Sequence, residues 1–159
     1  MKRFILPLLF SGLLVSAATA QSTIFLVRHA EKAGTGGTDP DLSEAGRARA
    51  ESLATALKDA GISAIFATEL KRTQQTAAPL SKLLHLDPTI IPAKDTAALM
   101  ARLRSSPANA LVVGHGNTIP DLIKGFGITS PINIGENDYD NLFLVVLDEP
   151  PRLIRLHYR

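Results

Sequence analysis

Two histidines and two arginines of this chain lie at or soon after the ends of apolar runs and are candidates for a reactive site. Arg28 and His29 directly follow a short apolar run, and His115 follows another one far downstream. Between them, Arg72 comes soon after a third run of this kind. Guanidinium groups bind anionic oxygens through paired hydrogen bonds, and an imidazole can act as a nucleophile or stabilise a charged oxygen. Together the four residues predict one site that binds an anion.

Predicted strands and helices alternate along the chain and carry these four residues. Apolar, β-branched runs are typical of buried strands, and the segments between them have the apolar spacing of helices. Pro79 should kink or restart the second helix, and Arg49 is predicted to lie on the solvated face of the first. We expect strands at 23–27, 62–67, 89–91, 110–114, 142–147 and 153–158, and helices at 44–60, 68–86, 95–104 and 118–125.

The order of these elements predicts an α/β fold, a three-layer α/β/α sandwich with a largely parallel central sheet. In such sheets, ligands bind in the crevice beyond the carboxyl ends of the strands. Arg28, His29 and His115 all fall at such ends. We therefore expect the edge of the sheet to hold them toward one ligand.

Residues 1–20 have the features of a secretory signal peptide. Lys2 and Arg3 precede a short apolar run that ends in small residues. Cleavage before Gln21 would leave a single domain, 21–159, in the periplasm or in the medium. The run is shorter than the ~20 apolar residues of a membrane span, so we expect no membrane association after cleavage. An uncleaved N-terminal anchor is the alternative.

The composition argues against several classes of protein. Without Lys2 and Arg3 the chain has 15 basic and 15 acidic residues, whereas a nucleic-acid surface needs a clustered excess of basic ones. The chain has no cysteine, which excludes a disulfide framework and thiol chemistry. We therefore predict no nucleic-acid partner, and the oligomeric state is left open.

In its motifs, the sequence resembles the histidine phosphatase superfamily, the phosphoglycerate mutase-like group. The matching residues are Arg28 and His29 in VRHAEK, Arg72 in LKRTQQTA and His115 in VVGHGN. They follow the order of that family, and the segment DLSEAGRARAESLA adds a supporting match. The resemblance implies a phosphoglycerate mutase-like fold and a phosphatase that acts on a small phosphorylated substrate, without a metal ion or a cofactor.

The same resemblance implies a role for each residue of the motifs. His29 would attack phosphorus and carry the phosphoryl group as phosphohistidine, which water then hydrolyses. Arg28, Arg72 and His115 would bind the phosphoryl oxygens. Because an imidazole attacks through an unprotonated nitrogen, we expect the other ring nitrogen of His29 to donate to a fixed acceptor such as a carbonyl.

Other residues are singled out by position rather than by a motif. We predict that Gly116, Asn117 and Glu31 contact the substrate, since glycine lets the backbone approach an anion closely. Members of the family usually supply a carboxyl group some two dozen residues after the second arginine, which points to Asp95 as the proton donor. Asp95 could instead be only a helix N-cap. The other candidate acids are Glu31, Glu136, Asp138 and Asp140.

Several alternative functions fit parts of the sequence. A metal hydrolase could use His29, His115 and a carboxylate, but the arginines would repel a bound dication, and no metal-ligand spacing is present. A non-catalytic phosphate-binding protein would be expected to lack some of the four residues. A phosphoglycerate mutase fits neither the short chain nor the predicted export. A phosphohistidine-protein phosphatase fits the size but not the export, and the loops 33–40 and 128–139, which would select the substrate, leave its identity open.

Overall fold

A computed structural model describes residues 22–35, 37–106 and 108–159 of the chain. The predicted signal peptide, 1–20, and its cleavage site lie outside these residues. Within the described ranges, no helix is both long enough and apolar enough to cross a membrane.

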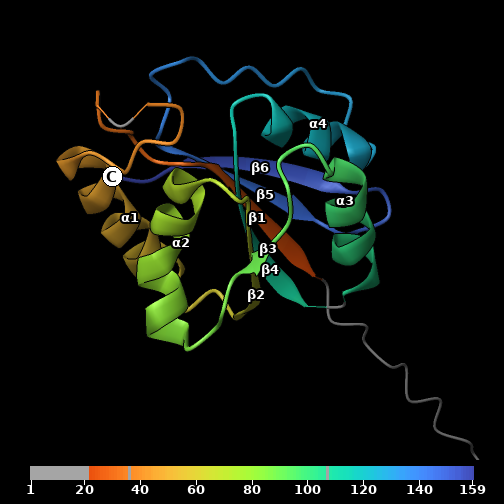
Figure 1. Ribbon diagram of the computed structural model, residues 1–159. Coiled ribbons are helices and arrows are strands. Elements are labelled where there is room, and N and C mark those ends of the chain that lie inside the picture. Colours follow the sequence, from red (N-terminus) through yellow and green to blue (C-terminus); the bar gives the residue numbers. More distant parts are fainter. Residues whose placement is uncertain (1–21, 36, 107) are drawn as a thin grey trace, which may run out of the picture.

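Strands and helices alternate along the described chain (Figure 1), and each segment predicted from the sequence forms the expected kind of element. The strands are β1 (Thr23–Arg28), β2 (Ile62–Ala67), β3 (Thr89–Ile90), β4 (Asn109–Gly114), β5 (Asn141–Val146) and β6 (Arg152–His157). The helices are α1 (Glu44–Leu57), α2 (Lys71–Leu84), α3 (Thr96–Ser105) and α4 (Thr118–Gly125).

The strands form one sheet in the order β3-β2-β4-β1-β5-β6. The first four strands of this order are parallel, whereas β5 pairs antiparallel with β1, and β6 pairs antiparallel with β5. The prediction of a largely parallel sheet is therefore confirmed. Strand β3 lies at one edge, where the prolines on either side of it remove no ladder hydrogen bond.

Helices cover both faces of the sheet and give the three predicted layers (Figure 1). Successive side chains of a strand point to opposite faces. Ile24 and Leu26 of β1 accordingly pack with α3 and α4, while Phe25 and Val27 pack with α1 and α2. Burying a side chain of this size contributes about 1.5–3 kcal/mol. Strand β1 is therefore fixed from both sides, and the residues that follow it start from a rigid support.

Helix α2 contains Pro79 and continues through it to Leu84. The restart predicted at this position does not occur. Proline removes one N–H donor from a helix, but Ala77 and Leu80 on either side of it are fully buried against the sheet. This packing keeps α2 in one piece.

A tight contact fixes the segment that follows β1. Gly46, in the first turn of α1, lies so close to the carbonyl oxygen of Glu31 that a Cβ atom there would overlap it. Ser43 caps α1 by accepting a hydrogen bond from the N–H of Gly46 at 3.0 Å, and its own N–H donates to the Glu31 carbonyl at 2.9 Å. The N–H of Ala30 donates to Oγ1 of Thr76 in α2 at 2.9 Å. These contacts hold the chain in place just beyond the strand.

Candidate active site

The two histidines of the motifs lie beside each other at the carboxyl ends of β1 and β4. In the parallel register Arg28 is opposite Gly114, and the N–H of His29 donates to the Gly114 carbonyl at 2.9 Å. A histidine directly follows each of these strands. The ring centroids of His29 and His115 are 5.4 Å apart, with an angle of 61° between the ring planes. The structure thus brings together two residues that are far apart in the sequence.

His29 has the protonation that a nucleophile needs. Burial, together with the positive charge of Arg72, lowers the pKa of His29 to about 4, so that the ring is neutral at physiological pH. Its Nδ1 lies 2.8 Å from the carbonyl oxygen of Ala30. Because a carbonyl oxygen only accepts, Nδ1 carries the single proton and donates it. Nε2 is left with a free lone pair.

Arg28 is held by the loop between α4 and β5. Its Nη1 donates to the carbonyl oxygens of Gly135 and Glu136, at 2.7 and 2.8 Å. Its guanidinium carbon lies 4.4 Å from the centre of the Tyr139 ring. Figure 1 shows this loop crossing over the end of the sheet. Nη1 of Arg28 is thus hydrogen-bonded to the loop, whereas its Nε is buried and has no partner among the described residues.

Arg72 supplies a second buried donor. Its Nη1 lies 3.9 Å from Oδ1 of Asp39, the distance of a weak ion pair. Its Nε is buried and, within the part of the chain that the structure describes, also lacks a partner. A buried donor without a partner costs about 1–3 kcal/mol, and more when it is charged. Since the charges of Arg28 and Arg72 both act on His29, the two unpaired donors indicate that an anion completes this site.

His115 is held by a hydroxyl group. Its Nε2 lies 3.2 Å from Oγ1 of Thr68, which directly follows β2 and lies 2.9 Å from Oγ1 of Thr73. Burial and the charge of Arg72 lower the pKa of His115 to about 4, although the negative charge of Glu69 opposes them. The ring is therefore neutral and carries one N–H, on Nδ1 or on Nε2.

The turn after His115 borders the unpaired donors. A Cβ atom on Gly116 would lie 3.8 Å from Nε of Arg28, so the backbone passes close to that atom. Asn117 is the N-cap residue of α4, but its side chain makes no capping hydrogen bond within the described structure and is exposed. Gly116 therefore lies beside one unpaired donor, whereas the contact of Asn117 with the substrate stays a prediction.

Glu31 forms an ion pair with a side chain of α1, and its contact with the substrate stays a prediction. Its carboxylate pairs with Arg49 of α1 through contacts of 2.7 to 2.9 Å, and both side chains are only 22% exposed. Burial raises the pKa of Glu31, but the hydrogen bonds from Arg49, a backbone hydrogen bond and the charges of Arg49 and Arg28 together lower it below its usual value. Glu31 is thus an ionised acceptor rather than a proton donor. The prediction that Arg49 lies on a solvated face was wrong, because its guanidinium reaches across to the segment after β1.

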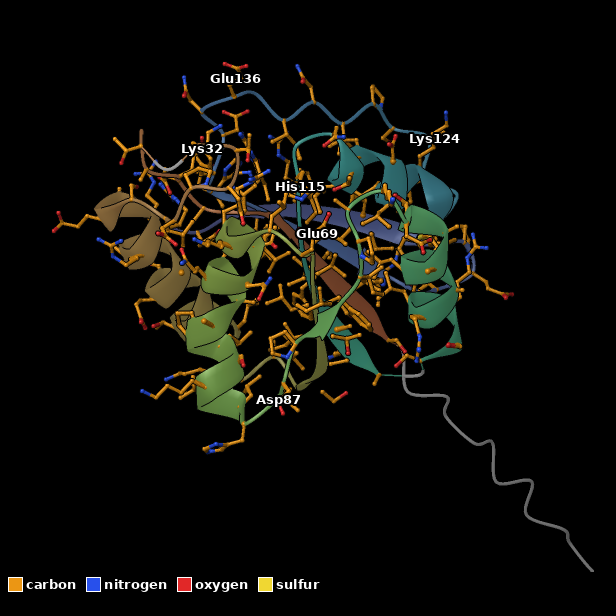
Figure 2. All side chains as sticks on the ribbon, viewed as in Figure 1. Lys32, Glu69, Asp87, His115, Lys124 and Glu136 are labelled. Atoms are coloured by element: carbon orange, nitrogen blue, oxygen red, sulfur yellow. The ribbon has the colours of Figure 1, made fainter. Side chains whose placement is uncertain are left out.

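The other predicted carboxyl groups are exposed or have partners of their own. Oδ1 of Asp95 accepts a hydrogen bond from the first turn of α3 at 3.0 Å, which is the N-cap role that the sequence left open. Asp138 accepts from a backbone N–H of its own loop at 2.8 Å, and Asp140 lies 3.2 Å from His157. Glu136 is exposed and lies on the side of its loop that faces away from the sheet (Figure 2).

Sequence reasoning missed three residues that border the site, namely Thr68, Glu69 and Tyr139. The Tyr139 ring lies 6.2 Å from that of His29, and no motif marks it. Thr68 and Glu69 directly follow β2, just as His29 follows β1 and His115 follows β4. Figure 2 shows Glu69 and His115 at the same end of the sheet. Position at a strand end was therefore a signal that could have identified both.

The site suits an anion better than a cation. No group of three or more His, Cys, Asp or Glu side chains that could hold a metal ion occurs among the residues that the structure describes. Arg28 and Arg72 place positive charge near both histidines, which lowers the pKa values of the two rings and would repel a dication.

The two buried histidines should make the folded state sensitive to acid. Each has a pKa of about 4 in the folded protein against an ordinary value of 6.5, so the unfolded chain binds more protons between these values. The free energy of unfolding should therefore fall as the pH falls from 6.5 toward 4, by up to about 3 kcal/mol per histidine.

Urea unfolding in phosphate-free buffer, from about pH 7 down to pH 5, measures this slope before most carboxylates titrate. His115→Gln should flatten the slope, because one of the two depressed pKa values is removed. A wild-type stability that stays constant over this range would contradict the burial of two neutral imidazoles.

Comparisons with known proteins agree with this geometry. The model of the histidine phosphatase superfamily (branch 1) matches residues 24–94, which include Arg28, His29 and Arg72. No curated protein matches the chain at a significant level. Residues 24–94 thus have the sequence pattern of the histidine phosphatase superfamily.

Solved structures with the same fold cover most of this chain. The protein histidine phosphatase SixA, in a complex with tungstate, is 21% identical with a TM-score of 0.68, and the match covers 85% of this chain and 96% of that one. SixA from Agrobacterium tumefaciens is 21% identical with a TM-score of 0.65, over 84% of this chain and 97% of that one. The mycobacterial glucosyl-3-phosphoglycerate phosphatase Rv2419c is 14% identical with a TM-score of 0.66, over 86% and 97%.

Proposed function

We propose that this chain is a phosphomonoester hydrolase that forms a phosphohistidine at Nε2 of His29. One observation carries the proposal: the unprotonated Nε2 of a buried histidine shares its site with two guanidinium Nε atoms that are buried and unpaired in the described chain. A phosphoryl group supplies both an electrophile for the lone pair and oxygens for these donors. The similarity to SixA, whose structure holds the tetrahedral oxyanion tungstate, supports the proposal.

The reaction has two steps. In the first, the lone pair on Nε2 of His29 forms a bond to phosphorus, while the bond from phosphorus to the leaving oxygen breaks. Arg28, Arg72 and an N–H of His115 stabilise the charge on the remaining oxygens. In the second step, water attacks phosphorus, the P–N bond breaks, and inorganic phosphate leaves. The Ala30 carbonyl accepts from Nδ1 throughout, which stabilises the positive ring of the intermediate.

Neither a metal ion nor a cofactor has a role in this mechanism. The two guanidinium groups supply the positive charge that a dication provides in other phosphatases, and their planar forks match the oxygens of a phosphoryl group. The nucleophile is a side chain of the protein rather than a metal-bound water.

A small phosphorylated compound is the proposed substrate. The second candidate is a phosphohistidine on another protein, which the similarity to the protein histidine phosphatase SixA favours. The match covers 96% of that structure. Both substrates would use the same four residues, and a non-catalytic phosphate-binding protein would need the two arginines but not the free Nε2 of His29.

A substrate panel tests the proposal. The mature domain, 21–159, would be incubated in EDTA with a set of phosphomonoesters and with a phosphohistidine peptide, and released phosphate would be measured. We expect hydrolysis of at least one phosphomonoester, and none by His29→Ala. Release of phosphate from the peptide alone would favour the second candidate. Binding of phosphate without any hydrolysis would contradict both candidates.

Replacing Arg72 with alanine should weaken the binding of phosphate and of vanadate. The change removes a charged donor whose Nε has no partner in the described chain, so the loss appears in ligand affinity. A hydrogen bond to a charged group contributes about 1.5–3 kcal/mol, which corresponds to a dissociation constant raised roughly 10- to 100-fold. Isothermal titration with vanadate measures it.

Arg102→Ala is the matched control for this experiment. Arg102 is an exposed arginine in the last turn of α3, so its removal changes the net charge equally without touching the site. If both variants bound vanadate as the wild type does, Arg72 would not belong to the anion site.

A further inference from the structure

Glu69 lies where a group that transfers protons to and from the substrate would have to lie. It directly follows Thr68, whose Oγ1 is 3.2 Å from Nε2 of His115. Its negative charge acts on His115, and it lies at the same end of the sheet (Figure 2). The side chain is exposed, so solvent can reach the carboxylate from outside the site. Glu69 therefore combines closeness to the oxyanion site with access to water.

The carboxylate of Glu69 is anchored at one oxygen. Oε2 accepts a hydrogen bond from the N–H of Ala93 at 2.8 Å, and the backbone carbonyl of Glu69 accepts from Nε2 of Gln74 at 2.9 Å. Oε1 makes no hydrogen bond with any described residue. One oxygen thus fixes the group, while the other is free to exchange a proton with a substrate.

This anchor connects Glu69 with the position that the sequence assigned to Asp95. Ala93 lies two residues before Asp95, in the segment that follows β3. The carboxylate of Asp95 is engaged in capping α3, where it accepts from the N–H of Ala98 at 3.0 Å. This segment therefore offers a backbone N–H, that of Ala93, rather than a carboxylate. The carboxylate of Glu69 accepts the hydrogen bond from this N–H.

We propose that Glu69 is the proton-transfer residue of the phosphatase reaction, an inference that rests on the function proposed above. As the P–O bond breaks, the leaving oxygen keeps the bonding electron pair and takes a proton from the Glu69 carboxyl group, which gives a neutral alcohol. When water attacks the phosphohistidine, one water proton passes to the Glu69 carboxylate and the remaining hydroxyl bonds to phosphorus. The P–N electron pair returns to Nε2 of His29.

The first proton arrives with the substrate. The hydrogen bond from Ala93 lowers the pKa of the Glu69 carboxyl, so the free protein holds it as a carboxylate at neutral pH. The monoanion of a phosphomonoester carries one proton on its phosphoryl group, and Glu69 takes this proton as the group binds. Glu69 passes the proton that it took from water to the departing phosphate and is a carboxylate again. Each turnover then converts one monoanionic ester and one water into an alcohol and a phosphate monoanion.

The test compares leaving groups. Glu69→Gln keeps the size of the side chain and an oxygen that can accept from Ala93, but it cannot transfer a proton. We expect kcat/KM to fall about 10²–10⁴-fold on an alkyl phosphate, whose leaving alkoxide needs a proton. On p-nitrophenyl phosphate, whose leaving group is stable as an anion, we expect less than about a tenfold loss. Glu51→Gln, an exposed position on α1, is the matched control.

A rapid-quench experiment tests the second step. With p-nitrophenyl phosphate, Glu69→Gln forms the phosphohistidine but lacks the base that activates water. We expect a burst of nitrophenol and an acid-labile phosphoryl label that accumulates on His29 to a higher level than in the wild type.

The outcomes separate this inference from the proposed function. Equal, small losses of Glu69→Gln on both substrates, without accumulated label, would overturn the role of Glu69 while leaving the phosphohistidine mechanism in place. A leaving-group dependence in Asp95→Asn, and none in Glu69→Gln, would assign the proton to Asp95. If His29→Ala hydrolysed both substrates as fast as the wild type, the proposed function itself would fail.

Discussion

Replacing His29 with alanine should abolish phosphomonoester hydrolysis and leave the fold intact. The substitution removes the lone pair that forms the bond to phosphorus, while the arginines and His115 still bind the phosphoryl group. Loss of a catalytic nucleophile typically lowers kcat by on the order of 10⁴-fold or more. His29 lies beyond the end of β1 rather than within the packed strand, so we expect circular dichroism and thermal unfolding close to those of the wild type. Steady-state assays on the best substrate of the panel measure the loss.

Covalent labelling provides the companion measurement. Rapid quenching of the wild type with ³²P-labelled substrate should trap an acid-labile, base-stable phosphoryl group, which is the behaviour of phosphohistidine, and His29→Ala should trap none. Fast turnover without any trapped label would favour direct attack by water. Retained turnover in His29→Ala would remove His29 from the mechanism.

Replacing Gly46 with alanine should destabilise the protein and impair catalysis together. At an ordinary helix position alanine is about 1 kcal/mol more favourable than glycine. At Gly46 the added Cβ would overlap the carbonyl oxygen of Glu31, so we expect the free energy of unfolding to fall by about 1–3 kcal/mol instead. Relieving the overlap moves the segment that contains Ala30, whose carbonyl holds the proton of His29 on Nδ1. We therefore also expect a lower kcat at saturating substrate.

Gly34→Ala is the matched control. A Cβ atom on Gly34 would meet nothing within 4 Å, so the free energy of unfolding of this variant should stay close to that of the wild type. Urea unfolding and steady-state kinetics of both variants test the contrast. A Gly46→Ala variant that is as stable as the wild type would show that the segment after β1 yields easily, and that its fit against α1 does not position His29.

Much of the fold could be predicted because its signals are local. The apolar run of β1 is buried on both faces, and Ser43 caps α1 as its residue type suggests. The closeness of His29 and His115 followed from the rule that parallel strands present their carboxyl ends at one edge. The restart at Pro79 failed because a local rule gave way to packing of α2 against the sheet.

The pairing of carboxylates could not be predicted, because it depends on which side chains meet across elements. Glu31 follows His29 by two positions, yet its partner is Arg49, which the helical pattern of α1 placed on a solvated face. Glu69 directly precedes the second motif, but only the fold shows that its carboxylate meets the backbone after β3. Contacts between side chains of different elements produce no periodic pattern in a sequence, so periodicity cannot predict them.

The hydrogen bonds between Arg28 and the loop between α4 and β5 lower the entropy cost of ordering this side chain when a ligand binds. A free arginine side chain has about 2 kcal/mol of rotamer entropy to lose when a ligand orders it. Arg28 has already lost that freedom, because the carbonyl oxygens of Gly135 and Glu136 fix its Nη1. The guanidinium of Arg28 is therefore already oriented before a phosphoryl group binds. Ordering this side chain then reduces the affinity for the ligand by less. A lysine could not do the same, because its side chain has a single nitrogen. A guanidinium can donate to the loop from one nitrogen and to the ligand from another.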